Sequence, residues 1–457
     1  MKFLAILLFF PLLAGAADPS QPSDAILKAH GQPQGELQIT YKKSIAGKDQ
    51  TIGLGLAADY DYADADGARS IHDYKLRRLL TVGPDRAYVD NSLYALVWHR
   101  VAELQNRANL MKAISAAKID VAKLPPASSD PFWMESELGV VDPALPRPEI
   151  AHSEEGGWSR WSVKGDEVAA VKFKADTVPA VLQPALRRFW GELLALHPTM
   201  IEAIAASGKL PEEMRFKMMT ANGPEEVHWV LTGAKWVPSV PYPLAAGLKA
   251  MPVEKNGAYP ELFQTLAAYV AEKRVPPEES VYTGKARAAI DRGAGLEAML
   301  WLLEMQLASG SPAAANCQQP GNSNPFCQLA PLAVPSAKTD PRFAMTFSPE
   351  APNLADRHKF DDLPNGYLPM LLFANKPAPK DVTFADNEKG LLSGLKAAPI
   401  ANFCKDVSDF YMRSWNPMAA WQVMDLGRDM AGHKQGDLLS QIDVLEANLA
   451  KTAPQFF

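Results

Sequence analysis

The sequence has only three cysteines in 457 residues, and it has none of the short motifs that mark the large enzyme families. There is no G-x-S-x-G elbow, no H-E-x-x-H zinc motif, no C-x-x-C-H haem site and no glycine-rich phosphate loop. S-x-x-K occurs at Ser115–Lys118 and Ser393–Lys396, but without the companion motifs that would make it informative. These absences exclude several large families and give no reason to expect a cofactor. They leave open an enzyme whose site is assembled from distant residues.

Clustered positive charge and long apolar runs are scarce as well. The net charge is −6 and no run of five or more basic residues occurs, so we expect neither nucleic acid nor anionic membrane surfaces as partners. After residue 17, every long apolar segment is interrupted by charge or proline. A transmembrane helix needs roughly 20 consecutive apolar residues. We therefore expect a soluble mature chain with no stable membrane insertion.

The N-terminus does carry one short apolar segment. Lys2 precedes the apolar core Phe3–Leu13, and Ala14–Ala16 then matches a small-residue cleavage site. This three-part pattern is typical of a secretory signal peptide, and the run is too short to remain as an anchor. We predict cleavage after Ala16 and a periplasmic or secreted mature protein.

An oxidising compartment favours a disulfide between Cys317 and Cys327. Proline, glycine and asparagine between them let the loop turn back on itself. In the chain-entropy model the bridge would restrict the unfolded chain by ~3 kcal/mol. Cys404 would then stay reduced, buried beside Phe403 and Val407. Three buried thiols, or either of the other two pairings, are the alternatives.

Proline is abundant, with 38 residues, and clusters of it mark three seams between predicted segments, at residues 125–148, 238–252 and 309–341. Across these seams the predicted secondary structure changes from a mixture of strands and helices to helices alone. The expected fold class is an α+β N-terminal part, with short antiparallel sheets and packed helices, followed by an all-α C-terminal part. The expected segments are 1–16 (signal peptide), 17–124 (α+β), 149–252 (α+β) and 256–457 (α-helical and repeat-like).

Local signals place several elements in the first two segments. Residues rich in β-branched and aromatic side chains predict strands, and Asp64–Gly67 is typical of a hairpin turn. A helix should begin near Asn91 or Ser92, either of which can cap it. Farther along, Pro198 should kink or divide a helical stripe that runs from Leu186 to Ile204. A second hairpin is predicted, with strands at 215–220 and 227–236.

The segment from Trp415 to Pro454 resembles a tetratricopeptide-type helical hairpin. Positions matching the family's first helix are Val423, Leu426, Gly427 and Met430, and those matching its second are Ser440, Val444 and Ala447. The turn between them is about three residues longer than the family's. The resemblance implies a helical repeat that buries its faces against neighbours and offers a surface to a partner.

The densest acidic cluster offers a candidate metal site. As a calcium loop, residues 62–73 would place Asp64, Asp66 and Asp73 at the third, fifth and twelfth positions. Such loops begin with an acidic ligand and end with a glutamate, whereas here the first position is Tyr62 and the last is the shorter Asp73. The simpler interpretation is a solvated hairpin tip.

Two further pairs are candidate functional residues. His99 and Glu103 stand four apart on one helix, where they could share a metal or a proton, although such pairs are common on helix surfaces. Trp158 and Trp161 follow two glycines and could stack on a sugar or a peptide. Packing in a core is the more usual role for tryptophan.

These observations favour an exported binding or scaffolding protein that contacts another protein or a peptide through its helical C-terminal region. The alternative is an exported hydrolase acting on peptide or glycan through a dispersed carboxylate or histidine site. A third hypothesis is a ligand-binding protein that uses Trp158 and Trp161. Convergence of polar side chains in one deep pocket would separate these hypotheses.

Overall fold

The computed structural model describes residues 22–84, 87–119, 130–220, 223–310, 317, 323–363, 365–374, 376–377, 379–434 and 436–457. The predicted signal peptide lies outside them. The chain forms two compact units. The first comprises the described residues up to Met251 together with Leu449–Phe457, and the second is Pro252–Asn448. In the described part of the chain, no helix is long and apolar enough to cross a membrane.

A 12-stranded sheet is the frame of the first unit. Neighbouring strands are antiparallel except for the pair β12 and β6. The strands, in spatial order, are β12 (Ala250–Met251), β6 (Tyr88–Ser92), β5 (Arg78–Val82), β4 (Ala68–Asp73), β3 (Tyr60–Ala65), β2 (Lys48–Leu56), β1 (Gln34–Ile45), β11 (Gly223–Val240), β10 (Lys209–Thr220), β9 (Asp166–Thr177), β8 (Trp158–Val163) and β7 (Ile150–Glu155).

The pairing of β1 with β11 joins the two predicted α+β segments in one sheet. Leu37 lies opposite Trp236, and Tyr41 lies opposite Leu231. Strands from residues 17–124 and 149–252 therefore share a hydrogen-bonded ladder. A pairing between strands so far apart in the chain leaves no local pattern in the sequence, since each strand needs only its own alternation of side chains.

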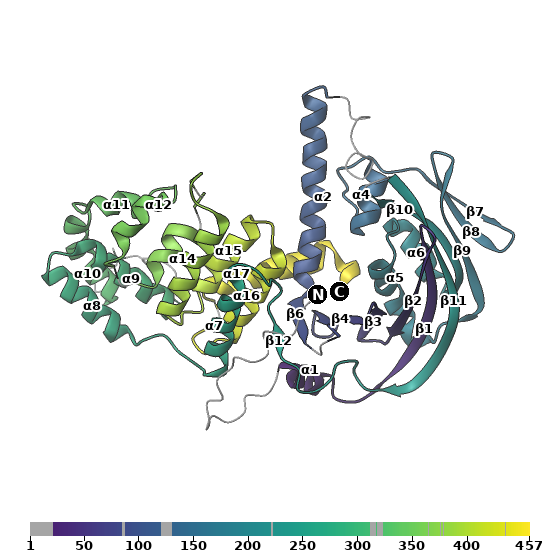
Figure 1. The fold of residues 1–457 in the computed structure, drawn as a ribbon, viewed down its shortest axis with the longest axis horizontal. Helices are drawn as coiled ribbons and strands as arrows, with labels where there is room; N and C mark the ends of the chain where they lie inside the picture. Colours follow the sequence, from purple (N-terminus) through teal and green to yellow (C-terminus); the bar gives the residue numbers. More distant parts are fainter. Residues whose placement is uncertain are drawn as a thin grey trace. The chain divides into compact units, whose positions relative to one another are not determined.

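Short helices fill the concave side of this sheet (Figure 1). Trp190 and Met200 are fully buried with Tyr41 and Trp229 from the strands, in one apolar core. The hydroxyl of Tyr41 donates to the carbonyl of Pro211 at 2.7 Å, so even this buried polar atom has a partner. The helical elements of the unit are α1 (Pro22–His30), α2 (Leu93–Ala116), α4 (Pro131–Leu138), η2 (Ala180–Ala185), α5 (Leu186–Leu193), α6 (Pro198–Ala206) and η6 (Pro454–Phe456).

Several local predictions are confirmed. Asp66 and Gly67 both have positive φ, 51° and 77°, in the two-residue turn between β3 and β4. Ser92 caps α2 by accepting the backbone N–H of Tyr94. Pro198 starts α6 and so divides the helical stripe, because proline lacks the N–H that a helix interior needs. The second predicted hairpin is formed by β10 and β11.

The second unit consists of helices, as the predicted fold class requires. Its elements are α7 (Tyr259–Ala271), α8 (Glu279–Asp291), α9 (Gly295–Ser309), α10 (Pro325–Ala337), α11 (Pro341–Thr346), α12 (Leu354–Arg357), η3 (His358–Phe360), α13 (Tyr367–Pro369), η4 (Met370–Ala374), α14 (Phe384–Ala397), α15 (Phe403–Arg413), α16 (Pro417–Asp429), η5 (Leu438–Ser440) and the part of α17 (Gln441–Thr452) that precedes Leu449.

Helix α10 lies inside the stretch 309–341 that the prolines mark as a seam. Asn324 caps it, and Pro325 occupies its first turn, where a missing N–H costs nothing. Pro331 and Pro335 lie in its interior. Five apolar residues at helical spacing are buried, which offsets the two lost hydrogen bonds; they are Phe326, Leu329, Ala330, Ala333 and Ala337.

The predicted disulfide is confirmed. Cys317 and Cys327 are bonded, with their Cα atoms 5.1 Å apart. The intervening residues 318–322 lie outside the described residues. Cys404 is free and fully buried in α15, and burial raises the pKa of its thiol to about 12. Such a thiol is inert at neutral pH, which removes it as a nucleophile.

The segment that resembles a tetratricopeptide hairpin does form two helices, α16 and α17. Arg428 of α16 pairs with Asp443 and Glu446 of α17 at 2.8 and 3.0 Å. In α16, Val423 and Gly427 are buried. In α17, Val444 is 65% exposed. The repeat assignment stays a prediction.

Candidate functional site

The acidic residues of the predicted metal site form a hairpin tip and its base. Asp64 makes a two-point ion pair with Arg69 across the hairpin, with both distances 2.7 Å. Asp66 accepts from the side chain of Gln50 at 2.8 Å. Asp73 lies at the other end of β4, fully buried. Among the residues that the structure describes, no three His, Cys, Asp or Glu side chains are grouped closely enough to hold a metal ion.

His99 and Glu103 lie on α2. The carboxylate of Glu103 accepts from Arg107 Nε at 2.8 Å, one turn farther along the helix. Arg107 also donates to Glu137 of α4 at 2.7 Å. Glu103 therefore takes part in an ion-pair chain that links α2 to α4.

The two candidate tryptophans lie on opposite faces of β8, as alternation in a strand requires. Trp161 is 3% exposed and belongs to the core. Trp158 is half-buried on the other face, where the guanidinium of Arg215 lies 4.3 Å from its ring centroid. The two rings cannot form one binding platform, because the sheet separates them.

The S-x-x-K pattern at residues 393–396 does not assemble a nucleophile and its base. The hydroxyl of Ser393 donates to the carbonyl of Gly390 at 2.6 Å. Lys396 is ion-paired with Glu261 of α7.

Histidines and carboxylates do gather inside the first unit. His30 lies 2.6 Å from Asp73, which also accepts from the hydroxyl of Tyr242 at 2.7 Å. Nearby on the same hairpin, His72 Nδ1 lies 2.8 Å from Asp61. All four side chains of the two His–Asp pairs are at most 11% exposed. This buried network ties α1, the β3–β4 hairpin and residue 242 together.

A cleft in the helical unit is the strongest candidate for a binding site. Its volume is about 540 Å³, within the range of ~300–1,000 Å³ for ligand pockets. Aromatic rings from four elements of the unit form much of its wall. They are Tyr282 of α8, Trp301 of α9, Phe360 of η3 and Phe373 of η4.

Two cations lie against those rings. The ammonium of Lys285, one turn beyond Tyr282 on α8, is 3.8 Å from the ring centroid of Trp301. The guanidinium of Arg357 is 4.3 Å from that of Phe373, and burial lowers the pKa of this arginine. Both groups line the cleft. The site thus places two cations against its aromatic walls, an arrangement that cation–π attraction stabilises. The carboxylates of Glu304 and Asp361 belong to residues that line it as well.

One buried carboxylate lines the cleft as well. Glu304 is 3% exposed and accepts the backbone N–H groups of Gly366 and Tyr367 at 2.8 and 3.3 Å. Burial raises the pKa of Glu304, although these two N–H groups and Lys285 act in the opposite direction. The carboxylate joins α9 to the start of α13 and shapes the cleft between them.

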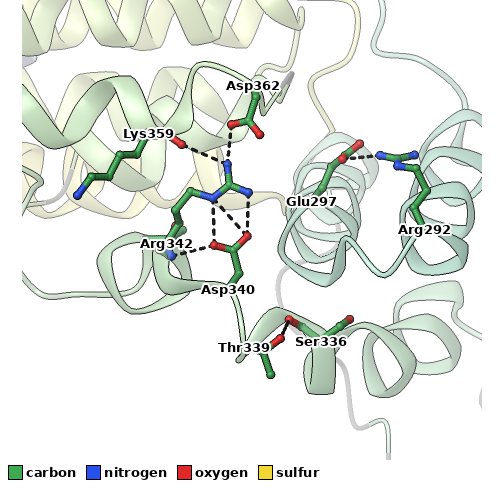
Figure 2. A network of polar contacts seen from close by, with 9 residues as sticks. Arg292, Glu297, Ser336, Thr339, Asp340, Arg342, Lys359 and Asp362 are labelled. Atoms are coloured by element: carbon green, nitrogen blue, oxygen red, sulfur yellow. Dashed lines mark hydrogen bonds and ion pairs between the residues drawn. The ribbon is translucent and has the colours of Figure 1, made fainter.

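Polar contacts outside the cleft hold its walls in place (Figure 2). Glu297 pairs with Arg292 at 2.5 Å and accepts from the indole N–H of Trp301 at 3.4 Å. On the other wall, Arg342 donates to Asp362 at 2.5 Å and to the carbonyl of Lys359 at 3.1 Å, which fixes the segment containing Phe360 (Figure 2). Asp340 accepts from the same guanidinium at 2.8 Å (Figure 2).

Sequence reasoning missed this cleft, although one signal for it was present. Helix α9 reads as an apolar stripe through Leu296, Leu300 and Leu303, and Glu304 interrupts it. A glutamate among such residues is buried only when it has partners, so it marks a special position. Its partners at residues 366–367 come from 62 positions farther on, and no local pattern announces them.

Comparison of the whole chain with models of protein families and with curated proteins finds no match in either.

Proposed function

We propose that this chain is an exported binding protein, and that its helical C-terminal unit holds its partner through the cleft around Trp301 and Phe373. The partner is another protein or a peptide, which inserts an apolar side chain. The observation that carries the proposal is the cleft itself, which combines aromatic walls with buried polar groups. Binding sites are typically concave, mostly apolar and equipped with a few well-placed polar groups.

Export rests on separate support. The disulfide between Cys317 and Cys327 is typical of oxidising compartments. The first sixteen residues match a secretory signal peptide. N-terminal sequencing of protein recovered from the periplasm or medium should begin at Ala17, and an intact Met1 there would contradict export with processing.

The cleft can be tested with a neutral aromatic probe, N-phenyl-1-naphthylamine, whose fluorescence rises in apolar surroundings. The change is Ala397→Trp, which adds a large ring at an exposed position lining the cleft. The matched control is Ala385→Trp, exposed on the same helix and away from the cleft. Both variants should keep the melting temperature of the parent chain, because neither alanine is in the core.

We expect saturable probe binding by the parent chain and by Ala385→Trp. Binding to Ala397→Trp should weaken by about tenfold or more, since a filled cleft loses roughly 1.4 kcal/mol or more of contact energy. Equal binding by all three proteins would contradict the assignment of the site.

The alternative function, an exported hydrolase acting on peptide or glycan, has one supporting observation. The buried pairs His30–Asp73 and His72–Asp61 bring imidazoles and carboxylates together in the first unit. Hydrolysis of generic peptide or glycoside substrates that is abolished by Asp61→Asn, with the fold intact, would favour this function over binding.

A further inference from the structure

Three residues that line the cleft each have a buried polar group with no hydrogen-bond partner within the described residues. These groups are the hydroxyl of Tyr282, the side-chain N–H₂ of Asn365 and the Nε–H of Arg357. Tyr282 is 1% exposed and Asn365 is 7% exposed. A buried polar group without a partner destabilises the folded chain, so three around one cleft need an explanation.

The orientation of Asn365 is fixed by its other atoms. Its Oδ1 accepts the backbone N–H groups of Tyr367 and Leu368, at 2.9 and 3.0 Å. An amide oxygen is the only atom of that side chain that can accept from N–H donors, so the N–H₂ group is the free one. Arg357 is held in a similar way, because its Nη2 donates to Asn387 at 2.5 Å and leaves Nε without a partner.

All three groups can donate a hydrogen bond, and Asn365 and Arg357 can do nothing else with these atoms. Lys285 adds a positive charge at an exposed position that also lines the cleft. An acceptor with negative charge matches the chemistry of all four groups, although Glu304 and Asp361 also line the cleft. A carboxylate is such an acceptor, with two oxygens and roughly four lone-pair sites.

We propose that the cleft recognises a carboxylate attached to an aromatic or branched apolar group. The carboxylate accepts from Tyr282, Asn365 and Arg357 and is attracted by Lys285. The apolar group packs against Trp301 and Phe373. This inference rests on the proposed function, because it names the chemistry of the partner that the same cleft would hold.

Such a carboxylate has two sources, the C-terminus of a peptide and a free aromatic acid. The aromatic walls and the hydrogen-bond donors of the cleft suit both sources. The two differ in whether a peptide chain is attached to the carboxylate-bearing group. Two matched pairs of probes separate the sources. The peptide pair is N-acetyl-Leu-Phe with a free C-terminus and its C-terminal amide, and the small-molecule pair is 2-naphthoate and 2-naphthamide.

Titration calorimetry with the whole mature chain compares these four probes. Each acid should bind at least about tenfold more tightly than its amide, since hydrogen bonds to a charged acceptor are stronger than those to a neutral one. Tighter binding of the peptide acid identifies a peptide C-terminus as the source. Tighter binding of 2-naphthoate identifies a free aromatic acid.

Two variants connect the preference to named groups. Tyr282→Phe removes an unpaired hydroxyl, so it should lower affinity for the acids about tenfold while the melting temperature of the free chain stays equal or rises. Lys285→Gln should also weaken the acids more than the amides. The matched control is Lys389→Gln, exposed on α14 and away from the cleft, which should change neither.

The outcomes separate this inference from the function on which it rests. Equal affinity for acids and amides, with the neutral naphthylamine still bound in the cleft, overturns the carboxylate and leaves the binding site standing. Failure of acids, amides and naphthylamine to bind overturns both. Acid preference that survives unchanged in Tyr282→Phe and Lys285→Gln overturns the placement of the carboxylate.

Discussion

The carboxylate of Glu304 accepts the backbone N–H of Gly366 at 2.8 Å, deep within the helical unit. This contact joins α9, which carries Trp301, to the segment that carries Asn365. Glycine fits at 366 without displacing a neighbour, whereas a Cβ atom there would lie 3.0 Å from the Cβ of Ala398. The hydrogen bonds that Glu304 accepts from Gly366 and Tyr367 thus connect two walls of the cleft.

Glu304→Gln should make the protein more stable at neutral pH. Burial raises the folded-state pKa of Glu304, so the folded chain binds this proton more tightly than the unfolded chain. The stability linked to that proton is present below the unfolded pKa of about 4.3 and is lost as pH rises through the folded pKa. Glutamine keeps an oxygen for Gly366 without a charge to bury.

The measurement is the melting temperature of both proteins from about pH 4 to about pH 8. The advantage of Glu304→Gln over the parent chain should grow as pH rises. A constant difference in melting temperature across that range would contradict the prediction that burial disfavours the charged form of Glu304.

Gly295→Ala should disturb the cleft by displacing helix α9. A Cβ at this position would clash with backbone atoms of Ala333 and Ala337, so α9 would have to move away from α10. We expect a loss of about 1–3 kcal/mol in unfolding free energy, together with weaker probe binding.

Gly284→Ala on α8 is the control, because nothing lies within 4 Å of its added Cβ. That change should stabilise the helix by about 0.5–1 kcal/mol. Denaturant unfolding of the two variants gives the comparison, and equal effects of the two would refute the predicted clash.

His72 should make the first unit more stable at low pH than at high pH. Burial of the imidazole lowers its pKa, but the carboxylates of Asp61 and Glu192 outweigh that effect and raise it overall. A raised histidine pKa gives stability that is present below the unfolded value of about 6.5 and is lost as pH rises through the folded value.

The melting temperature of His72→Gln should therefore lie below that of the parent chain by an amount that shrinks from about pH 6 to about pH 9. His152→Gln, which changes an exposed histidine on β7, is the matched surface control. A gap that widens with pH would mean that His72 is neutral in the folded protein.

Thiol counting tests the predicted state of the three cysteines. The folded, oxidised protein should show no accessible thiol, because Cys404 is fully buried and the other two cysteines are bonded. Denaturation without reductant should expose one thiol. Finding three would remove the disulfide, and a peptide map that links Cys404 to another cysteine would replace it.

Features set by neighbouring residues could be predicted from the sequence. The turn at Asp66–Gly67, the cap at Ser92 and the break at Pro198 each follow from backbone preferences that act within a few residues. The disulfide followed from the spacing of the two cysteines and from the predicted oxidising compartment. The change from strands to helices could also be predicted, because the spacing of apolar residues that is typical of each element is visible within a short stretch of sequence.

Features set by distant partners could not be predicted. The pairing of β1 with β11 merges the two predicted α+β segments in one sheet, and neither strand encodes its partner. The cleft depends on Glu304 meeting residues 366–367 and on Tyr282 being left without a partner. An unpaired hydroxyl is a property of the packed structure, so no spacing of residues could reveal it.

Photo-crosslinking tests the binding site in the helical unit most directly. The probe is 4-benzoylbenzoate, an aromatic carboxylate that inserts into nearby C–H bonds on irradiation. The whole chain is irradiated with the probe, with and without excess 2-naphthoate, and the labelled peptides are mapped by mass spectrometry. We predict competed labelling on the peptides that contain Tyr282, Trp301 and Phe373. Labelling spread over the surface, or concentrated on the sheet around Trp158, would contradict the account.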